Sequence, residues 1–473
     1  MSTPDPASPL GENNHIHIIG IGGAGMSAIA RLLLQRGVTV SGSDRQSNGT
    51  TRALQSAGAT IYEGHAAKNI AGATTLFISS AVKDDNPEIA AAKIAGLPIL
   101  TRREFFKYLL PEKTQIAVAG THGKTTTTAL IIHLLREMGQ DPSYIVGGML
   151  NSTGDNAHVG QGSAFVVEAD EYGGMFLGLS PHIAVITNIE HDHPDIFPTL
   201  ADVMRSFREF VALLPNDGLL IACDDDPNAL TLAEERRSAG LPVITYGITN
   251  PEADWSATLE QANPGETVFT LHHSDMNQRV VSALPGTHNI LNTLAALAAV
   301  YALTGDLDKA IPPLATFAGT GRRFELMGQA GGVSVLSDYA HHPTAIRATL
   351  QATRQRYPQA AIWAVWQPHT YSRTRTLADS FVTAFPDADH VLITDIYAAR
   401  EKPTAGDPTG SDLAQIATLA GHSDVRYSGD LSATAAILQR EVHPGDVVII
   451  FSAGDAPQVG ASLLDFLRLP KPK

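Results

Sequence analysis

The sequence is poor in cysteine, in basic residues and in long apolar runs. Cys223 is the only cysteine among 473 residues, which excludes an intrachain disulfide and a cluster of thiolate metal ligands. The 33 lysines and arginines are outnumbered by 48 aspartates and glutamates, which gives a formal net charge of −15. No basic stripe stands out along the chain, so we expect neither nucleic acid nor an anionic membrane as a partner.

Long apolar stretches are missing as well. None approaches the ~20 residues that a membrane-spanning helix needs, so we expect no membrane span. The N-terminal stretch "MSTPDPASPLGENN" is polar, contains prolines and has no apolar signal core. We therefore expect residues 1–14 to form a disordered leader and the protein to be cytoplasmic.

The chain does have length and a repeating pattern. It is long enough for about three domains of ~150 residues each, and its 44% hydrophobic content suits large cores. Apolar runs such as "HIHIIG", "QIAVAG" and "DVVIIFSAG" alternate with glycine turns and helix-like segments. This alternation predicts an α/β fold of parallel sheets with crossover helices. We expect three such domains, at 1–113, 114–319 and 320–473.

The first glycine-rich motif, "GIGGAG" at Gly20–Gly25, follows an apolar run and precedes a helix-like segment. Asp44 ends the next expected strand, where an acid can bind a ribose hydroxyl. This pattern predicts a nucleotide-binding loop without identifying the nucleotide, so an NAD-dependent oxidoreductase is one alternative. In a second alternative, the glycines only permit tight packing between helix and strand.

The second glycine motif is "GTHGKTTTT", which again stands between an apolar run and a helix-like segment. Two residues, Thr121 and His122, separate its glycines, where the standard phosphate loop has four. Helix N-termini attract anions, Lys124 can reach terminal phosphates, and the Thr125 hydroxyl can bind Mg²⁺. We therefore favour a phosphate loop over a glycine turn with a surface lysine.

Acidic residues follow two further apolar runs. "VVEADEYGG" places Glu168, Asp170 and Glu171 at the carboxyl end of an expected strand, where an acid can hold Mg²⁺. "TNIEHDHPDIF" places His191, Asp192, His193 and Asp195 after another strand. A metal cluster and a solvated loop both remain open for these residues, although histidine is an unusual magnesium ligand.

Polar residues recur at the ends of later segments. "GTHNILN" carries Asn289 and Asn292 three residues apart, on one helix face, where amides suit adenine edges or helix capping. "GRRFE" lies in an expected linker, from which an arginine can reach a phosphate. "SDYAHHPT" and "QPHTYSRTRT" place histidines and arginines at the carboxyl edge of the third sheet, a setting that suits the carboxylate of a small acid.

Taken in order, "GTHGKTTTT", "EADE", "NIEHDH", "GTHNILN", "GRRFE", "DYAHHPT" and "QPHTYSRT" resemble the Mur ligase family, whose members form amide bonds with ATP in peptidoglycan synthesis. The resemblance runs from His15 to about Leu467. It implies an N-terminal Rossmann-like domain that binds a UDP-sugar, a central P-loop-type ATPase domain and a C-terminal Rossmann-like domain that binds an amino acid.

Within the family, "GIGGAGMS", "QPHTYSRT" and "DIYAARE" resemble the branch that adds L-alanine. The branch that reattaches a recycled murein tripeptide shares "HHPT" and does not usually carry the second of these stretches. The later family members use a carbamylated lysine in the central domain, whereas this sequence has no lysine between Lys124 and Lys309. Thr370 stands where many members of the alanine-adding branch have arginine, which leaves one amino-acid contact open.

The resemblance implies that the chain joins L-alanine to UDP-N-acetylmuramate through an acyl phosphate, with ATP and Mg²⁺, Mn²⁺ being an alternative ion. It also implies a monomer or weak homodimer. The catalytic residues it implies are Lys124, His193 and Arg323, and the metal ligands are Thr125, Glu168 and His193. The implied ATP-binding residues are Gly120, Thr121, His122, Gly123, Lys124, Thr125, Thr126, His288, Asn289, Asn292, Arg323 and Asp338. Those implied for the UDP-sugar are Gly22, Ala24, Gly25, Asp44, Ser79, Ser80 and Arg102, and those for the amino acid are Tyr339, His341 and Arg373.

Three rival functions remain open at this point. An oxidoreductase leaves the second phosphate loop unexplained, and an ATP-hydrolysing regulator leaves the cationic residues of the third domain unexplained. A ligase for a peptide or for another amino acid is the strongest competitor.

Overall fold

The computed structural model describes residues 14–79, 82–263 and 265–469. It consists of two compact units. Unit 1 holds the described residues of Met1–Ile189, Met204–Asp254 and Ala295–Pro313, and unit 2 holds those of Glu190–Val203, Trp255–Leu294 and Leu314–Lys473. The predicted leader lies almost entirely outside the described residues. No helix in the described part of the chain is long and apolar enough to cross a membrane.

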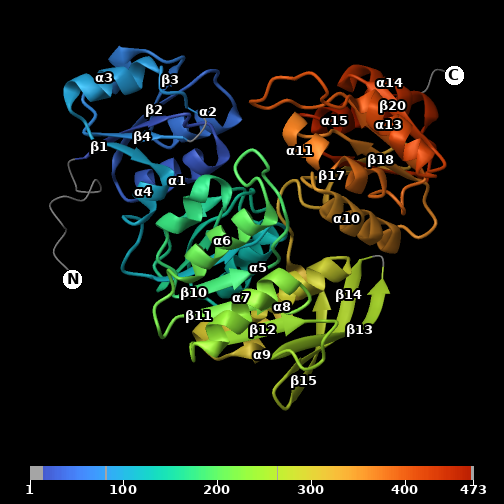
Figure 1. Cartoon of the computed structure of the whole chain (residues 1–473), viewed down its shortest axis with the longest axis horizontal. Helices are drawn as coiled ribbons and strands as arrows, with labels where there is room; N and C mark the ends of the chain where they lie inside the picture. Colours follow the sequence, from blue (N-terminus) through green and yellow to red (C-terminus); the bar gives the residue numbers. More distant parts are fainter. Residues whose placement is uncertain (1–13, 80–81, 264, 470–473) are drawn as a thin grey trace. The chain divides into compact units, whose positions relative to one another are not determined.

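Unit 1 begins with a parallel five-stranded sheet in the order β3-β2-β1-β4-β5 (Figure 1). Its strands are β1 (His15–Ile19), β2 (Thr39–Asp44), β3 (Thr60–Glu63), β4 (Thr75–Ile78) and β5 (Ile99–Thr101). The helices between them are α1 (Ala24–Gln35), α2 (Gly49–Ser56), η1 (Ala67–Ile70) and α3 (Pro87–Ala95), and α4 (Arg102–Phe106) follows β5. The strand order reverses at β1, which places the first glycine motif at the sheet's switch point.

The second sheet of unit 1 has the strand order β12-β11-β10-β6-β9-β7-β8, with only β8 antiparallel to its neighbour. Its strands are β6 (Thr114–Ala119), β7 (Ser143–Ile145), β8 (Ala157–His158), β9 (Ala164–Glu168), β10 (Ile183–Ile186), β11 (Leu219–Cys223) and β12 (Val243–Gly247). Unit 1 also holds α5 (Lys124–Glu137), η2 (Tyr172–Gly178), α7 (Pro227–Ser238) and α9 (Leu307–Ala310). Residues of both units belong to α6 (Leu200–Val211), α8 (Thr287–Thr304) and η3 (Pro312–Thr316).

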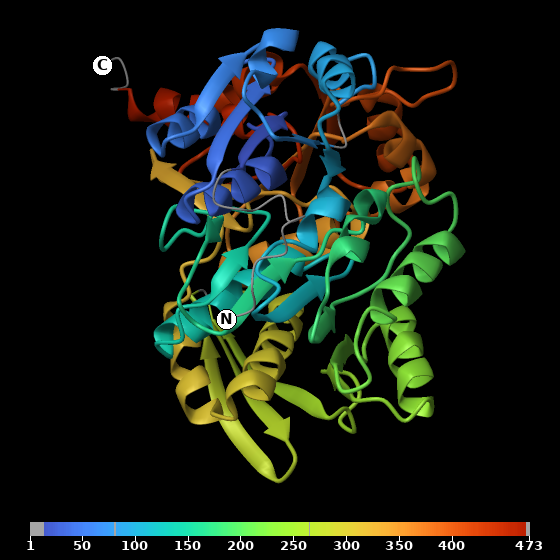
Figure 2. The same ribbon diagram turned by 90° about the vertical axis from the view of Figure 1, so that its left-hand side faces the viewer.

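Unit 2 contains three long antiparallel strands, β13 (Trp255–Asn263), β14 (Glu266–His273) and β15 (Met276–Ser282), drawn in yellow tones in Figure 2. These strands were not predicted from the sequence. Their signal is weak because β13 is exposed along most of its length, so its side chains do not form an apolar run.

The six-stranded sheet of unit 2 has the order β16-β17-β21-β18-β19-β20, parallel except for the edge strand β16. Its strands are β16 (Glu325–Ala330), β17 (Val333–Asp338), β18 (Ile362–Trp366), β19 (His390–Thr394), β20 (Val425–Gly429) and β21 (Val447–Phe451). The helices are α10 (Pro343–Arg356), α11 (Tyr371–Thr376), α12 (Ala378–Val382), α13 (Gly410–Leu419), α14 (Leu431–Glu441) and α15 (Pro457–Arg468). Ile362, Ala364 and Trp366 pack into one core while Trp363 and Val365 pack into another, which explains why β18 is apolar throughout.

The predicted α/β architecture of parallel sheets is therefore confirmed. The domain boundaries predicted at 113 and 319 stay a prediction.

A buried polar network stabilises the first sheet. Glu88, in the first turn of α3, accepts hydrogen bonds from the Ser43 hydroxyl and the Asn69 amide, each at 2.6 Å. His17 lies 3.8 Å from the same carboxylate, and neither side chain is exposed. Burial alone would raise the pKa of Glu88, but its interactions with His17, Ser43 and Asn69 lower it to about 2. The carboxylate is therefore charged inside the domain.

Glu88→Gln removes this charge and keeps the size of the side chain. Because the folded-state pKa lies below the ordinary value of 4.5, the ionised group stabilises the fold fully above about pH 4.5, and this contribution disappears as the pH falls toward 2. We expect a loss of roughly 3 kcal/mol at most at neutral pH, since one pKa unit corresponds to ~1.4 kcal/mol. Calorimetric unfolding of both proteins from neutral pH to about pH 3.5 measures the difference, which should narrow below about pH 4.5. If the difference in unfolding free energy between the two proteins stays constant over this pH range, Glu88 does not stabilise the fold through its charge.

Candidate active site

The first glycine motif forms the turn between β1 and α1. The Gly22 amide donates a hydrogen bond of 2.9 Å to Oδ2 of Asp44, at the end of the neighbouring strand β2. A Cβ atom at Gly25 would lie 2.5 Å from the Arg102 guanidinium, and one at Gly20 would lie 3.3 Å from the Ser79 side chain. The structure therefore brings these predicted UDP-sugar residues together. Ala24 begins α1, and Ser80 lies outside the described residues.

The second glycine motif joins β6 to α5. Gly120 and Gly123 adopt positive φ angles of 136° and 81°, which glycine accommodates without strain. The amides of Thr121 and His122 donate to the main-chain and side-chain oxygens of Asn188 at 2.9 and 2.8 Å. The stretch that follows β10 therefore supports the loop through Asn188, a residue that the sequence patterns did not single out.

Lys124 is the first residue of α5, and its ammonium group lies over the second glycine loop. Nζ donates to the carbonyl of Gly120 at 2.5 Å and to the carboxylate of Glu171 at 2.8 Å. Burial lowers the pKa of Lys124, but the charges of Glu171 and Asp170 outweigh it, so the net pKa is raised. The lysine is thus held protonated. Its pairing with Glu171 was not predicted, because sequence spacing does not reveal which of three neighbouring acids faces the loop.

Thr125 and Glu168 lie together, as the predicted metal site requires. The threonine hydroxyl donates to Oε1 of Glu168 at 3.0 Å, while Oε2 accepts a hydrogen bond of 2.6 Å from the Gly147 amide. A hydroxyl and a carboxylate are oxygen ligands of the kind that Mg²⁺ prefers, so the donor set fits this ion. The third predicted ligand, His193, belongs to unit 2.

Arg102 lies beside the first glycine motif and interacts electrostatically with two acids at the end of β9. Its guanidinium occupies the space beside Gly25 and lies 5.3 Å from the Phe106 ring. Burial lowers the pKa of Arg102, and the charges of Asp170 and Glu168 oppose that shift. The arginine predicted for the UDP-sugar therefore also interacts with Glu168, a predicted metal ligand, and with Asp170.

In unit 2, the predicted adenine-binding residues begin α8. Asn289 donates to the Pro285 carbonyl at 2.7 Å, and Asn292 donates to Oδ1 of Asn289 at 3.0 Å. Both amides are buried. Burial lowers the pKa of His288 to about 4, so this ring is neutral at physiological pH.

The turn before β16 and the end of β17 form another predicted group. Asp338 accepts hydrogen bonds of 2.7 Å from the amides of Phe324 and Ala340. Burial raises the pKa of Asp338, and the charge of Arg323 opposes the increase. The Arg323 guanidinium lies 4.9 Å from the Tyr339 ring, so these three predicted residues adjoin.

Five side chains of unit 2 form what we call the Asp192 cluster: Asp192, His193, His341, His369 and Arg373. Arg373 donates to Asp192 at 2.7 Å, to Nδ1 of His369 at 2.9 Å and to Nδ1 of His193 at 3.3 Å. Nε2 of His341 lies 3.9 Å from Asp192. Three members of this cluster, His193, His341 and Arg373, are site residues predicted from the sequence, whereas the pairing of Asp192 with Arg373 was not predicted.

The charges of this cluster follow from burial and from one ion pair. Burial raises the pKa of Asp192, but Arg373 draws it well below its usual range. Burial and Arg373 lower the pKa of His341 well below its usual range and that of His369 to about 4. At neutral pH the arginine and the aspartate are therefore charged while both of these rings are neutral.

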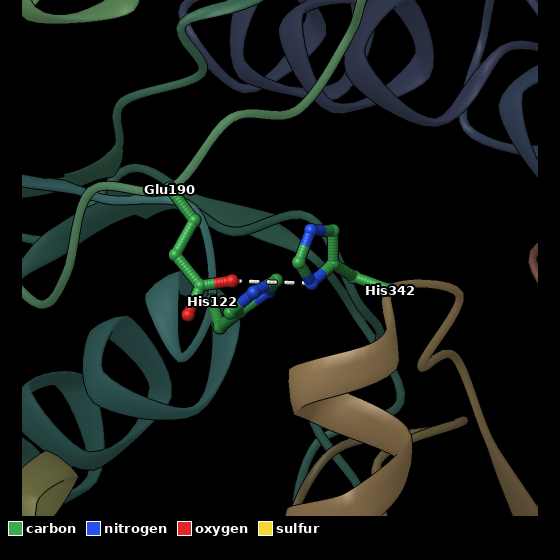
Figure 3. Close-up of side chains that lie close together, drawn as sticks. All are labelled: His122, Glu190 and His342. Atoms are coloured by element: carbon green, nitrogen blue, oxygen red, sulfur yellow. Dashed lines mark ion pairs between the residues drawn. The ribbon is translucent and has the colours of Figure 1, made fainter. Parts of the chain in front are cut away.

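A second acid of the same segment contacts the start of α10. The Glu190 carboxylate lies 3.2 Å from Nδ1 of His342 and accepts a hydrogen bond of 2.9 Å from the Thr344 hydroxyl. Figure 3 shows the Glu190 and His342 side chains pointing toward each other. These contacts, which the sequence did not reveal, fasten the segment Glu190–Val203 within unit 2.

Comparisons with known proteins point to one family over nearly the whole chain. Three Mur ligase family models match: the catalytic domain at residues 15–114, the middle domain at 118–300 and the glutamate ligase domain at 322–454. A UDP-N-acetylmuramate–L-alanine ligase of Renibacterium salmoninarum is 42% identical over 98% of this chain and 97% of its own length. One from a Geobacter species is 42% identical over 98% of this chain and 99% of its own length.

Solved structures show the same likeness. The UDP-N-acetylmuramate–alanine ligase of Thermotoga maritima matches with a TM-score of 0.81 at 27% identity, covering 95% of this chain and 98% of its own. A murein peptide ligase of Psychrobacter arcticus matches with a TM-score of 0.73 at 27% identity, covering 97% of this chain and all of its own.

The Asp192 cluster makes a testable electrostatic prediction. Arg373 is one cause of the lowered pKa of His369, after burial, so Arg373→Gln should raise that pKa above about 4 while leaving it below its ordinary value of 6.5. Histidine ring signals, followed by NMR through a pH titration of the labelled protein, measure the change, and His369→Gln assigns the signal. An unchanged midpoint in the variant would show that the charge of Arg373 does not contribute to this pKa.

Proposed function

Because the chain belongs to the Mur ligase family, we propose that it joins L-alanine to the carboxylate of UDP-N-acetylmuramate, with ATP as the third substrate and ADP and phosphate as the other products. The observation that carries this proposal is the 42% identity, over nearly the whole of both chains, with relatives that bear the name of this activity. The nearest alternative is ligation of a murein peptide, because a structure of that name also resembles the chain over its full length.

The reaction has two steps. A carboxylate oxygen of the sugar attacks the γ-phosphorus of ATP, ADP leaves, and an acyl phosphate forms. The amine of alanine then attacks the acyl carbon, phosphate leaves, and the nitrogen loses a proton. Such phosphoryl transfer depends mainly on positioning and on charge neutralisation. Domain closure around the substrates would protect the acyl phosphate from water.

The second glycine loop supports the first step. We assign the β- and γ-phosphates of ATP to the loop of Gly120–Thr126, where the Lys124 side chain is 13% exposed and its raised pKa keeps it protonated. Thr125 and Glu168 would hold Mg²⁺, and His193 would serve a second ion near the sugar carboxylate. A bound Mg²⁺ would neutralise negative charge on the phosphate oxygens.

The remaining ATP contacts are assigned to unit 2. His288, Asn289 and Asn292 would contact adenine, Asp338 the ribose and Arg323 a phosphate. Asp338 already accepts two main-chain hydrogen bonds, which fix the orientation of its carboxyl group. A fixed acceptor is what recognition of a hydroxyl requires.

The other substrates are assigned to the remaining predicted residues. The UDP-sugar would lie against the first glycine loop, whose close contact with Arg102 leaves no room for a side chain at Gly25. The contacts assigned to it are Gly22, Ala24, Gly25, Asp44, Ser79, Ser80 and Arg102. Tyr339, His341 and Arg373 would bind the amino acid. On this assignment, the functional domains are 1–113, 114–319 and 320–473.

Two further proposals follow from the substrates and the family. Because the substrates are intracellular nucleotides and a free amino acid, we place the reaction in the cytoplasm. We also propose that the protein works as a monomer or a weak homodimer, which sedimentation of the purified protein would test.

Mass spectrometry of complete and incomplete mixtures tests the activity. We expect the alanine adduct of UDP-N-acetylmuramate only when ATP, the UDP-sugar and L-alanine are all present, with ADP and phosphate released. Glycine and L-serine should be tried in parallel, because the strictness for alanine depends on the shape of the amino-acid site. Product with murein tripeptide and none with free alanine would establish the alternative.

Lys124→Ala tests the phosphate loop. Without the ammonium group, the negative charges of the phosphates repel one another in the transition state. We therefore expect a loss of at least ~3 kcal/mol of transition-state stabilisation, or more than ~100-fold in kcat/KM. Steady-state ADP release measures the effect. Lys309→Ala is the matched control, because that lysine is 72% exposed and pairs only locally with Asp306. Near-normal turnover in folded Lys124→Ala protein would show that the loop is structural.

A further inference from the structure

The charge of the Asp192 cluster raises a problem for amino-acid binding. The α-carboxylate of an amino acid is an anion and needs a positive partner. Arg373 is buried against Asp192 at 2.7 Å, and the two charges largely cancel. Thr370, at the start of α11, adds no charge. A cation outside the Arg373–Asp192 pair would therefore strengthen the binding of a carboxylate here.

Arg400 is in a position to supply it. It follows β19 in a loop whose main chain is tied to the stretch before α11: Tyr397 donates to the Pro368 carbonyl at 2.8 Å, and Thr370 donates to the Tyr397 carbonyl at 2.9 Å. The Tyr397 ring also stacks on His369, with centroids 5.7 Å apart.

The residues on either side of Arg400 in the sequence are also fixed in position. Glu401, the next residue, accepts a hydrogen bond of 2.9 Å from the Ser372 amide at the start of α11. Ala399, the preceding residue, has a positive φ of 52°, which turns the chain sharply before the arginine. Contacts on both sides therefore fix where the Arg400 side chain leaves the loop.

The Arg400 charge acts on the cluster. Burial and Arg373 lower the pKa of His369 most, and Arg400 lowers it further. The guanidinium itself is 53% exposed and lies 3.8 Å from the Asp195 carboxylate. An ion pair this long and this exposed contributes little energy, so a bound carboxylate can compete with Asp195 for the arginine.

We propose that Arg400 binds the α-carboxylate of the incoming amino acid and thereby selects an amino acid over a simple amine. This inference rests on the proposed function and deepens it, because it assigns the anionic half of the second substrate to a residue outside the predicted set. The competing structural role is an anchor, in which Arg400 only holds the segment Glu190–Val203 through Asp195.

Kinetics of Arg400→Gln test the proposal. We expect KM for L-alanine to rise ~10- to 100-fold, as for the loss of a hydrogen bond to a charged group. KM for ATP and for UDP-N-acetylmuramate should stay within about two-fold, and kcat at saturating alanine should change little. Lys402→Gln is the matched control, because it removes one positive charge from the same loop and should leave all three KM values unchanged.

Two further measurements separate a substrate contact from an anchor. Asp195→Asn removes the competing carboxylate, so it should leave KM for alanine unchanged or lower it, whereas an anchor role predicts the same increase as in Arg400→Gln. L-Alaninamide lacks the carboxylate, so its kcat/KM should be almost insensitive to Arg400→Gln. An increase in KM for alanine in Asp195→Asn, or an equal loss with alaninamide, would overturn the proposal.

The outcomes for the two proposals remain distinct. If the wild-type protein forms no alanine adduct, the proposed function fails and this inference fails with it. If the wild type forms the adduct and Arg400→Gln has an unchanged KM for alanine, the inference alone is wrong. Thermal unfolding of each variant shows whether a kinetic change comes from loss of the fold.

Discussion

Parallel strands end at a common edge of their sheet, and each sheet that carries a predicted site uses that edge. In unit 1 the glycine motifs follow β1 and β6, while Asp44 and Glu168 end β2 and β9. In unit 2 the stretches that supply the Asp192 cluster and Arg400 follow β17, β18 and β19 or belong to Glu190–Val203. The apolar run of a strand therefore determines the position of the site residues as well as the core, because the polar side chains begin where the run ends.

Buried charges at these edges occur as pairs. Lys124 pairs with Glu171 at 2.8 Å, and Arg373 pairs with Asp192 at 2.7 Å. Pairing offsets the cost of removing each charge from water and keeps both partners ionised. An anionic substrate that approaches such a cation must compete with the carboxylate already present, so the acid tunes how strongly the cation binds. Arg400 differs in that its acidic partner is more distant and both groups contact water.

Much of the fold and part of the site could be predicted from the sequence. Glycines after apolar runs correctly located both loops, because few other features explain a lysine and threonines at a helix start. The antiparallel strands β13 to β15 were missed because β13 is largely exposed. The partners of Lys124 and Arg373 were missed for a different reason. Glu171 was one of three neighbouring acids, and Asp192 lies 181 positions from Arg373, so only the folded chain selects them. The sequence shows that Thr370 stands where many relatives have arginine. The position of Arg400, in contrast, depends on the loop contacts made by Tyr397 and Glu401.

The place of Arg102 has a thermodynamic consequence. Its guanidinium lines the space beside Gly25 and also interacts with Glu168 and Asp170. An anion bound beside Gly25 screens this positive charge, so the acids experience less of it and hold a cation more tightly. By linkage the effect is mutual: the cation increases the affinity for the anion by the same factor. Ligands bound at the two glycine loops of unit 1 would therefore be coupled through one side chain, and a double titration would measure the coupling free energy.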